Sequence, residues 1–211
     1  MNIKELDYTG YFEKTVVAIR FFIRGLDRLR GIDFLAPLLL RLYLAPIFWM
    51  AGANKLVNFT STVEWFGSTE SGLGLPVPWL LVLLVALTEV FGAIFLVLGF
   101  GVRIISIPLI ITMFFAGFLV HWKNGWLAIA TGDGIFATDR TTGAIERLNQ
   151  AKTLLQSYGD YAWLTEHGNF VVLNNGIEFA ATYLIMLTTL LFIGGGRYVS
   201  LDYWLRKKYF N

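Results

Sequence analysis

Four apolar runs constrain the fold of this chain more than any other feature of its sequence. They cover residues 36–56, 79–100, 104–122 and 175–193. Each is about 20 residues long, which as an α-helix matches the hydrocarbon thickness of a bilayer. The hydrophobic fraction of 56% and the mean hydropathy of +0.60 exceed what the core of a soluble domain needs. We therefore predict an all-α membrane fold, with a left-handed bundle of four transmembrane helices in a domain over 36–196.

The segments before and after this domain are amphipathic. Within residues 1–35, the stretch 11–30 places apolar and charged side chains at helical spacing. This pattern predicts a helix that lies on the membrane surface or, alternatively, packs on other protein. Its four arginines suit anionic headgroups. The tail 197–211 is also amphipathic, and it follows a glycine run that ends the fourth span.

The connection 123–174 is the one sizeable polar segment between the spans. Its sequence predicts a β-hairpin around Arg140–Gly143, followed by a short amphipathic helix over 145–158. The earlier connection, before the second span, is rich in Gly, Pro and Trp and is too apolar for a hydrated loop. We expect it to lie at the membrane interface or to re-enter it.

Lysine and arginine are distributed unevenly between the two sides that four spans create. Eleven lie in the terminal segments and the short turn between the second and third spans, whereas five lie in the other two connections. The positive-inside rule therefore predicts that both termini are cytoplasmic and that 123–174 lies outside. The first residues lack the apolar region of a signal peptide, so we expect the first span to serve as the insertion signal.

Composition excludes several kinds of chemistry. The chain has no cysteine, and its two histidines are His121 and His167. Disulfides, iron–sulfur clusters and Cys/His zinc sites are therefore excluded, and we predict no metal site. The net charge of +2 is too small, and its basic residues too scattered, to indicate nucleic-acid binding.

Arg41, Glu89 and Glu178 are ionisable residues within the spans. Burying an ionised side chain in mid-membrane costs roughly 2.5–3.5 kcal/mol, so each needs a partner or a wet cavity. At about 1.5 Å per residue, Arg41 lies roughly 7 Å inside one edge and Glu89 roughly 14 Å from the other. An arginine side chain can cover most of the remaining gap. We therefore predict an Arg41–Glu89 ion pair.

A second polar group is expected near the outer face. Three of its residues also have a purely structural interpretation: Lys55 could be a snorkelling anchor, His121 an interfacial hydrogen bonder and Glu178 a helix cap. Trp65, next to Phe66, could form a lid over a ring-shaped lipid-soluble ligand or simply pack the loop. The group consists of Asn54, Lys55, His121, Trp122 and Glu178.

Several stretches resemble the DoxX-like family of small four-helix membrane proteins, over about 38–202. They are RLYLAPIFWMAGANKL with Arg41 and Lys55, TEVFGAIFLVLG with Glu89, and HWKNGW with His121. NNGIEFAATY with Glu178 and the closing GGGRYVSLDYW resemble a narrower subgroup, encoded beside copper-related, ribosomally synthesised modified peptides and their maturation enzymes. The resemblance implies a bacterial inner-membrane protein, with 123–174 in the periplasm, linked to quinone or redox partners.

The leading hypothesis is a redox-associated membrane component, which could be a subunit of an oxidoreductase. It would bind a quinone-like ligand between its helices, since the chain has no haem, flavin or iron–sulfur motif. Permeation of a proton, metal or small solute is one alternative, and a noncatalytic scaffold for a redox or peptide-maturation partner is another. Homo-oligomers are compatible with each. The residues predicted to handle protons are Glu89, Glu178 and His121, and those predicted to bind the ligand are Arg41, Asn54, Lys55, Trp65 and Trp122.

Overall fold

A computed structural model describes residues 8–210 and the side chains of 12–27 and 29–210. Within that part every regular element is a helix, and strand-like pairing is confined to one antiparallel bridge, between Ile129 and Leu173. The prediction of an all-α fold is confirmed. Residues 1–7, which belong to the predicted N-terminal segment, and Asn211 lie outside the described residues.

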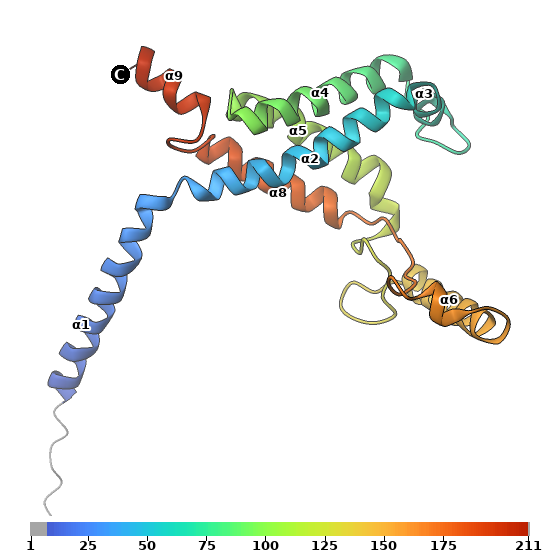
Figure 1. The fold of residues 1–211 in the computed structure, drawn as a ribbon, viewed down its shortest axis with the longest axis horizontal. Helices are drawn as coiled ribbons and strands as arrows, with labels where there is room; N and C mark the ends of the chain where they lie inside the picture. The colour runs from blue at the N-terminus through green and yellow to red at the C-terminus, as the bar shows by residue number, and fades with distance from the viewer. Residues whose placement is uncertain (1–7, 211) are drawn as a thin grey trace, which may run out of the picture.

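Four helices lie side by side and form the body of the molecule (Figure 1). α2 packs on α4, and α5 packs on α8. α5 continues through a π-helical turn, η2 (Ala116–His121), and a 3₁₀ turn, η3 (Trp122–Asn124). The four helices are α2 (Leu35–Val57), α4 (Pro78–Leu98), α5 (Val102–Phe115) and α8 (Glu178–Ile193). Their shared core is built from Leu44, Phe48, Leu96, Leu109, Leu187 and Leu190.

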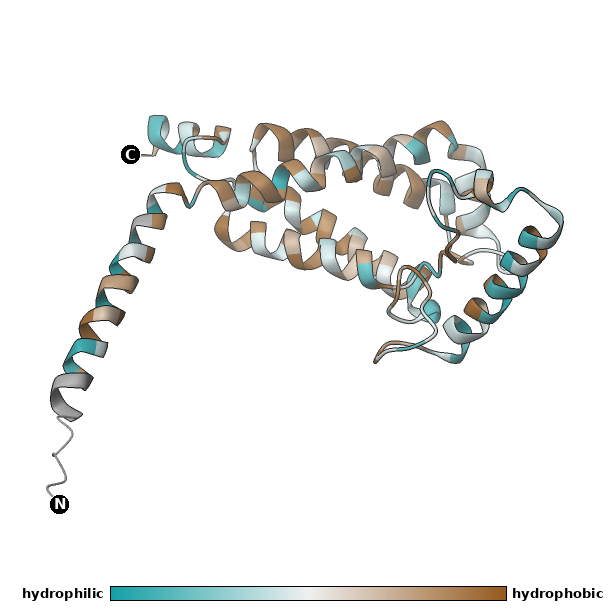
Figure 2. Cartoon of the chain, turned by 60° about the horizontal axis from the view of Figure 1, so that its bottom comes forward, coloured by the Kyte–Doolittle hydropathy of each residue, from teal (hydrophilic) through white to brown (hydrophobic). Residues whose placement is uncertain are grey.

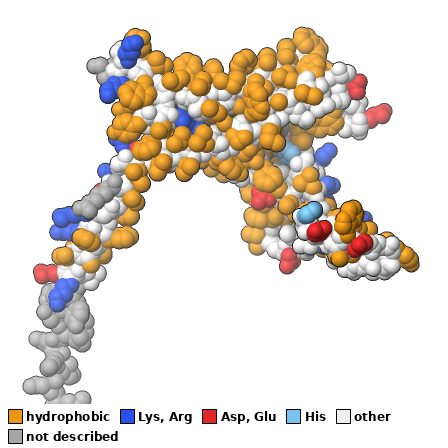
Figure 3. Space-filling model, in the orientation of Figure 1, with side chains coloured by type: hydrophobic (Ala, Val, Ile, Leu, Met, Phe, Trp, Pro, Cys, Tyr) orange, Lys and Arg blue, Asp and Glu red, His pale blue; other side chains and the backbone are white. Residues whose placement is uncertain are grey.

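The outer surface of this bundle is apolar (Figures 2 and 3). Met50, Ile104 and Phe192 are each at least 70% exposed, which in water would be costly and in lipid is not. α2, α4 and the continuous helix over 102–124 are long and apolar enough to cross a membrane. The chain is therefore a multi-pass membrane protein. α8 has 16 residues, fewer than the roughly 20 that a full crossing needs, so a fourth crossing stays a prediction.

Both terminal segments lie at one end of the bundle (Figure 1). α1 (Tyr8–Asp27) and the 3₁₀ turn η1 (Arg28–Ile32) lead into α2, and α1 projects away from the other helices. Its apolar side chains are uncovered, with Phe12 and Phe22 71% and 66% exposed. The structure thus has a helix over most of 11–30, as expected, and its position on a membrane surface stays a prediction.

The opposite end carries the two longer segments between the spans. α3 (Phe59–Gly67) follows α2 directly, and α6 (Asp139–Tyr158) and α7 (Tyr161–Leu164) lie in the polar connection 123–174. The hairpin predicted around Arg140–Gly143 is wrong, because these residues form the first turn and a half of α6. Thr138 caps this helix: its hydroxyl accepts from the Thr141 amide at 3.3 Å, and its own amide donates to the Thr141 hydroxyl at 2.9 Å.

The polar connection is fastened to the start of α8 by the buried side chain of Asn174. Its Nδ2 donates to the carbonyl oxygens of Asn124 at 2.8 Å and Leu127 at 2.6 Å, while Arg140 Nε donates to its Oδ1 at 3.0 Å. Buried amides of this kind are stable only when their donors and acceptors are satisfied. The connection therefore has a defined position over that end of the bundle.

Candidate functional site

A cavity of about 670 Å³ lies between α4 and α5, and α3 with the loop 68–77 covers one end of it. Its volume is within the range of pockets that bind small molecules. Three apolar side chains in its wall, Leu84, Ile111 and Phe115, are about half exposed on the outside of the bundle. The cavity therefore opens sideways, between two membrane-spanning helices, toward the lipid.

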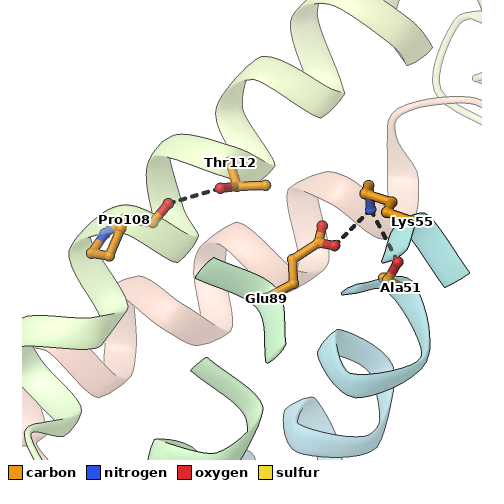
Figure 4. A network of polar contacts seen from close by, with 5 residues as sticks. All are labelled: Ala51, Lys55, Glu89, Pro108 and Thr112. Carbon is orange, nitrogen blue, oxygen red and sulfur yellow. Dashed lines mark hydrogen bonds and ion pairs between the residues drawn. The ribbon is translucent and has the colours of Figure 1, made fainter. Parts of the chain in front are cut away.

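The polar residues of the cavity centre on one ion pair. Glu89 is 2% exposed, and its Oε2 lies 2.6 Å from Lys55 Nζ (Figure 4). Lys55 Nζ also donates to the carbonyl oxygen of Ala51 at 3.4 Å. Desolvating two charges costs several kcal/mol per ion, so such a pair is a weak source of stability. The polar side chains that reach the cavity are Lys55, Thr88, Glu89, Thr112 and His121.

A glycine on α2 brings the two charges together. A Cβ added at Gly52 would lie 2.8 Å from Val90 Cγ2 and 2.9 Å from the Ala86 carbonyl oxygen, so only glycine permits this approach of α2 to α4. Lys55 lies one turn further along the same face of α2. Its side chain consequently reaches back along α4 to Glu89 instead of extending out of the bundle as an anchor.

The α5 wall of the cavity is an irregular helix. Pro108 is the seventh residue of α5, and its ring removes a backbone hydrogen bond. The carbonyl oxygen of Pro108 accepts from Thr112 Oγ1 at 3.0 Å (Figure 4). The π-helical turn η2 then carries the helix to His121. Such turns are frequent at functional sites because they redirect side chains.

His121 has a defined tautomer in its neutral form. Its Nδ1 lies 2.9 Å from the carbonyl oxygen of Asn175, which also accepts from Asn124 Nδ2 at 3.0 Å. Because a carbonyl oxygen only accepts, Nδ1 carries a proton and Nε2 is the atom that can accept or release one. The ring lines the cavity.

Trp65 and Phe66 lie at the covered end of the cavity. Their rings meet edge to face at 5.5 Å, and both line the cavity. The loop beyond them is held by backbone bonds from Leu73 to Trp65 at 3.1 Å and from Leu75 to Phe66 at 2.8 Å. Val77, where this loop joins α4, has a φ of 49°, which is strained for a β-branched residue.

The predicted Arg41–Glu89 pair is wrong. Arg41 is 1% exposed, but its Nη1 and Nη2 donate to the carbonyl oxygens of Gly195 and Val199, both at 3.0 Å. The prediction rested on the depth of each residue in the membrane, which placed the two side chains within reach of each other. It did not take account of the rotation of each helix about its axis, and this rotation directs the two side chains to different neighbours. Arg41 lies at the end of the bundle that carries the termini, and it does not line the cavity.

Glycine turns make room for Arg41. A Cβ at Gly99, whose φ is 65°, would lie 1.8 Å from Arg41 Nη1, so no other residue fits there without displacing the guanidinium. Asp202 closes the same region: its Oδ1 and Oδ2 accept from the amides of Gly101 at 2.7 Å and Val102 at 2.9 Å. Arg41 therefore joins α2 to the turn after α8.

Three other predicted site residues lie outside the cavity wall. Glu178 begins α8 and its Oε2 accepts from the Ala128 amide at 2.9 Å, so it fastens the polar connection. The exposed Asn54 side chain accepts from Asn58 Nδ2 at 2.8 Å. Trp122 is 63% exposed and packs against Phe118.

Sequence reasoning missed Gly52, Thr88, Pro108 and Thr112, although each had a local signal. Gly52 lies within a spanning helix, where small residues commonly mark close helix contacts. Thr88 precedes Glu89 directly, and Pro108 with Thr112 falls one helical turn apart within the third run. These signals become informative only once the partner helix is known.

The family comparison covers the part of the chain that builds the cavity. The DoxX family model matches residues 36–122. These residues form a DoxX-like region. It contains both members of the Lys55–Glu89 pair, Trp65 and His121, whereas α8 and the polar connection lie outside the DoxX-like match. No curated protein and no solved structure matches the chain.

Proposed function

We propose that this DoxX-like protein binds a quinone-like molecule from the bilayer in the cavity between α4 and α5. The single observation that carries the proposal is the ion pair between Lys55 and the buried Glu89 at the edge of an apolar cavity. A ring with polar oxygens and an apolar tail matches both features. The sideways opening suits a molecule that is dissolved in lipid rather than in water.

The polar groups suit such a ring. Lys55 Nζ is a hydrogen-bond donor that can turn from the Ala51 carbonyl oxygen to a carbonyl oxygen of the ligand while it stays in contact with Glu89. Within the described chain Lys55 Nζ donates to only one of the two carboxylate oxygens of Glu89, Oε2. The Trp65 and Phe66 rings supply apolar faces for the ligand ring.

A redox role would use the same residues as proton carriers. A bound quinone supplies two-electron chemistry and takes up two protons on reduction. Lys55, Glu89 and the Nε2 atom of His121 are the groups of the cavity that can hold or move those protons. The electrons would come from a separate redox protein. We propose that this partner works at a bacterial inner membrane, with both termini of this chain in the cytoplasm; a copper-related peptide system would supply one such setting.

Equilibrium binding of a short-chain quinone to detergent-purified protein tests the proposal. We expect saturable binding that weakens about tenfold or more in Glu89→Gln, because a charge-assisted contact next to the ligand is lost. Glu178→Gln is the matched comparison, since a glutamine oxygen can still accept from Ala128 and the residue lies outside the cavity.

A second matched pair reports on the position of the ligand. Quenching of tryptophan fluorescence by the quinone should fall in Trp65→Phe and persist in Trp122→Phe, because only Trp65 lines the cavity. Absence of binding to the parent protein, or equal loss in Glu89→Gln and Glu178→Gln, would refute the proposal.

A further inference from the structure

A second cavity, of about 400 Å³, lies at the end of the bundle that carries the termini. Three separate segments form it: the first turn of α5, the glycine turn after α8, and α9 (Leu201–Tyr209). Each segment contributes an arginine, namely Arg103, Arg197 and Arg206. Arginines from distant parts of a chain that meet in one hollow are typical of a binding site for an oxyanion.

Two of these arginines are held in place by hydrogen bonds to other parts of the chain. Arg103 Nη2 donates to the carbonyl oxygen of Phe192 at 2.9 Å, and a Cβ at Gly194 would lie 3.2 Å from Arg103 Nε, so the guanidinium lies closely against the glycine turn. Arg197 Nη2 donates to Asp33 Oδ1 at 2.7 Å and to the Arg30 carbonyl oxygen at 2.8 Å. The hydrogen bonds that Asp33 Oδ1 accepts from Arg197, together with the charge of Asp33, raise the pKa of Arg197.

The charge in this cavity is not neutralised from within. Its one acidic residue, Asp202, uses both oxygens on the backbone amides of Gly101 and Val102. Within the chain as described, Arg103 and Arg206 form no ion pair with any acidic group. Two guanidinium groups are therefore available to a negatively charged molecule.

The surroundings indicate a lipid rather than a soluble anion. Ile104 and Ile193, which also line the cavity, are 75% and 46% exposed on the apolar surface of the bundle. On α9, Trp204 is half exposed, with Lys207 Nζ 5.4 Å from its ring centre. Tryptophan and basic residues together are typical of the headgroup level of a membrane.

We propose that this cavity binds the phosphate of an anionic phospholipid, with Arg103 and Arg206 as its ligands and the acyl chains lying along Ile104 and Ile193. The site is independent of the quinone-binding proposal, because it shares no residue with the larger cavity. A lipid bound there would join α5, the end of α8 and α9.

Native mass spectrometry of the protein with phosphatidylglycerol or phosphatidylcholine tests this site. We expect the parent to retain phosphatidylglycerol preferentially, and the double variant Arg103→Gln/Arg206→Gln to bind it about tenfold or more weakly. Arg147→Gln/Lys152→Gln is the matched control: it removes the same charge from α6, at the opposite end, and should bind like the parent.

Thermal unfolding of each variant checks that it is folded. The single variant Arg206→Gln, at an exposed position, is milder and should bind phosphatidylglycerol severalfold more weakly than the parent. Equal retention of phosphatidylcholine, or equal loss in the control, would overturn the proposal. Displacement of the lipid by an equal concentration of inorganic phosphate would also overturn it, in favour of a free-phosphate site.

Discussion

The two ends of the helix bundle bury charge in different ways. At the end that carries the termini, Arg41 is surrounded by protein and donates to two backbone carbonyl groups. Near the other end, Lys55 and Glu89 pair with each other beside an apolar cavity. A buried charge whose contacts are all backbone stabilises one conformation, whereas a charge pair facing a cavity leaves atoms available for a ligand. The comparison separates a structural residue from candidate functional ones that looked alike in the sequence.

The largest effect on stability is expected from removing the charge of Arg41, at the end of the bundle that carries the termini. Arg41→Met leaves the carbonyl groups of Gly195 and Val199, one buried and one partly buried, without these donors, which should lower the free energy of unfolding by about 4 kcal/mol. Denaturant unfolding in detergent measures this change, with the exposed Arg147→Met as control. Quinone binding by the fraction that stays folded should match the parent. A parent-like stability would show that Arg41 is not a structural residue.

Two glycines near Arg41 test separately whether its contacts stabilise the fold. Gly99 and Gly101 both have positive φ, but a Cβ at Gly99 would collide with Arg41, whereas one at Gly101 would meet open space. Gly99→Ala should therefore cost about 3 kcal/mol, which combines overpacking with backbone strain, and Gly101→Ala about 1 kcal/mol from strain alone. Equal losses of unfolding free energy in the two variants would mean that contact with Arg41 contributes nothing.

Removing the charges of the Lys55–Glu89 pair beside the cavity should not lower stability. Replacing the ion pair by apolar side chains of similar size, as Lys55→Met/Glu89→Leu, should leave stability unchanged or raise it by about 1 kcal/mol, because the desolvation cost disappears. The same variant should bind no quinone. If it unfolds as readily as Arg41→Met, the Lys55–Glu89 pair is structural and the two ends do not differ.

The smallest effect concerns the surface ion pair between Asp33 and Arg197, whose side chains are about half exposed. Asp33→Asn should lower the free energy of unfolding by about 0.5 kcal/mol at low salt. The difference from the parent should shrink as salt is added, because screening weakens exposed pairs. A loss as large as that of Arg41→Met would show that this contact also holds the bundle together.

Some of this protein could be read directly from its residues. The apolar runs predicted α2, α4 and the continuous helix over 102–124 to within a few residues of their ends, because a spanning helix must be long and apolar throughout. The same argument located Lys55, Glu89 and His121 as exceptions that needed explanation. The prediction of a hairpin around Arg140–Gly143 was wrong because Thr138 and Thr141 suit a helix cap as well as a turn.

The sequence by itself determined that this chain enters a membrane and which of its residues are costly there. Only the tertiary structure decided which partner each of them has. Helix rise fixes the depth of a residue to within a few ångströms, but depth does not specify the rotation of a helix or its neighbour. Gly52 and Gly99 set those contacts by allowing close approach. For that reason Arg41 joins a glycine turn and Glu89 joins Lys55 at the cavity.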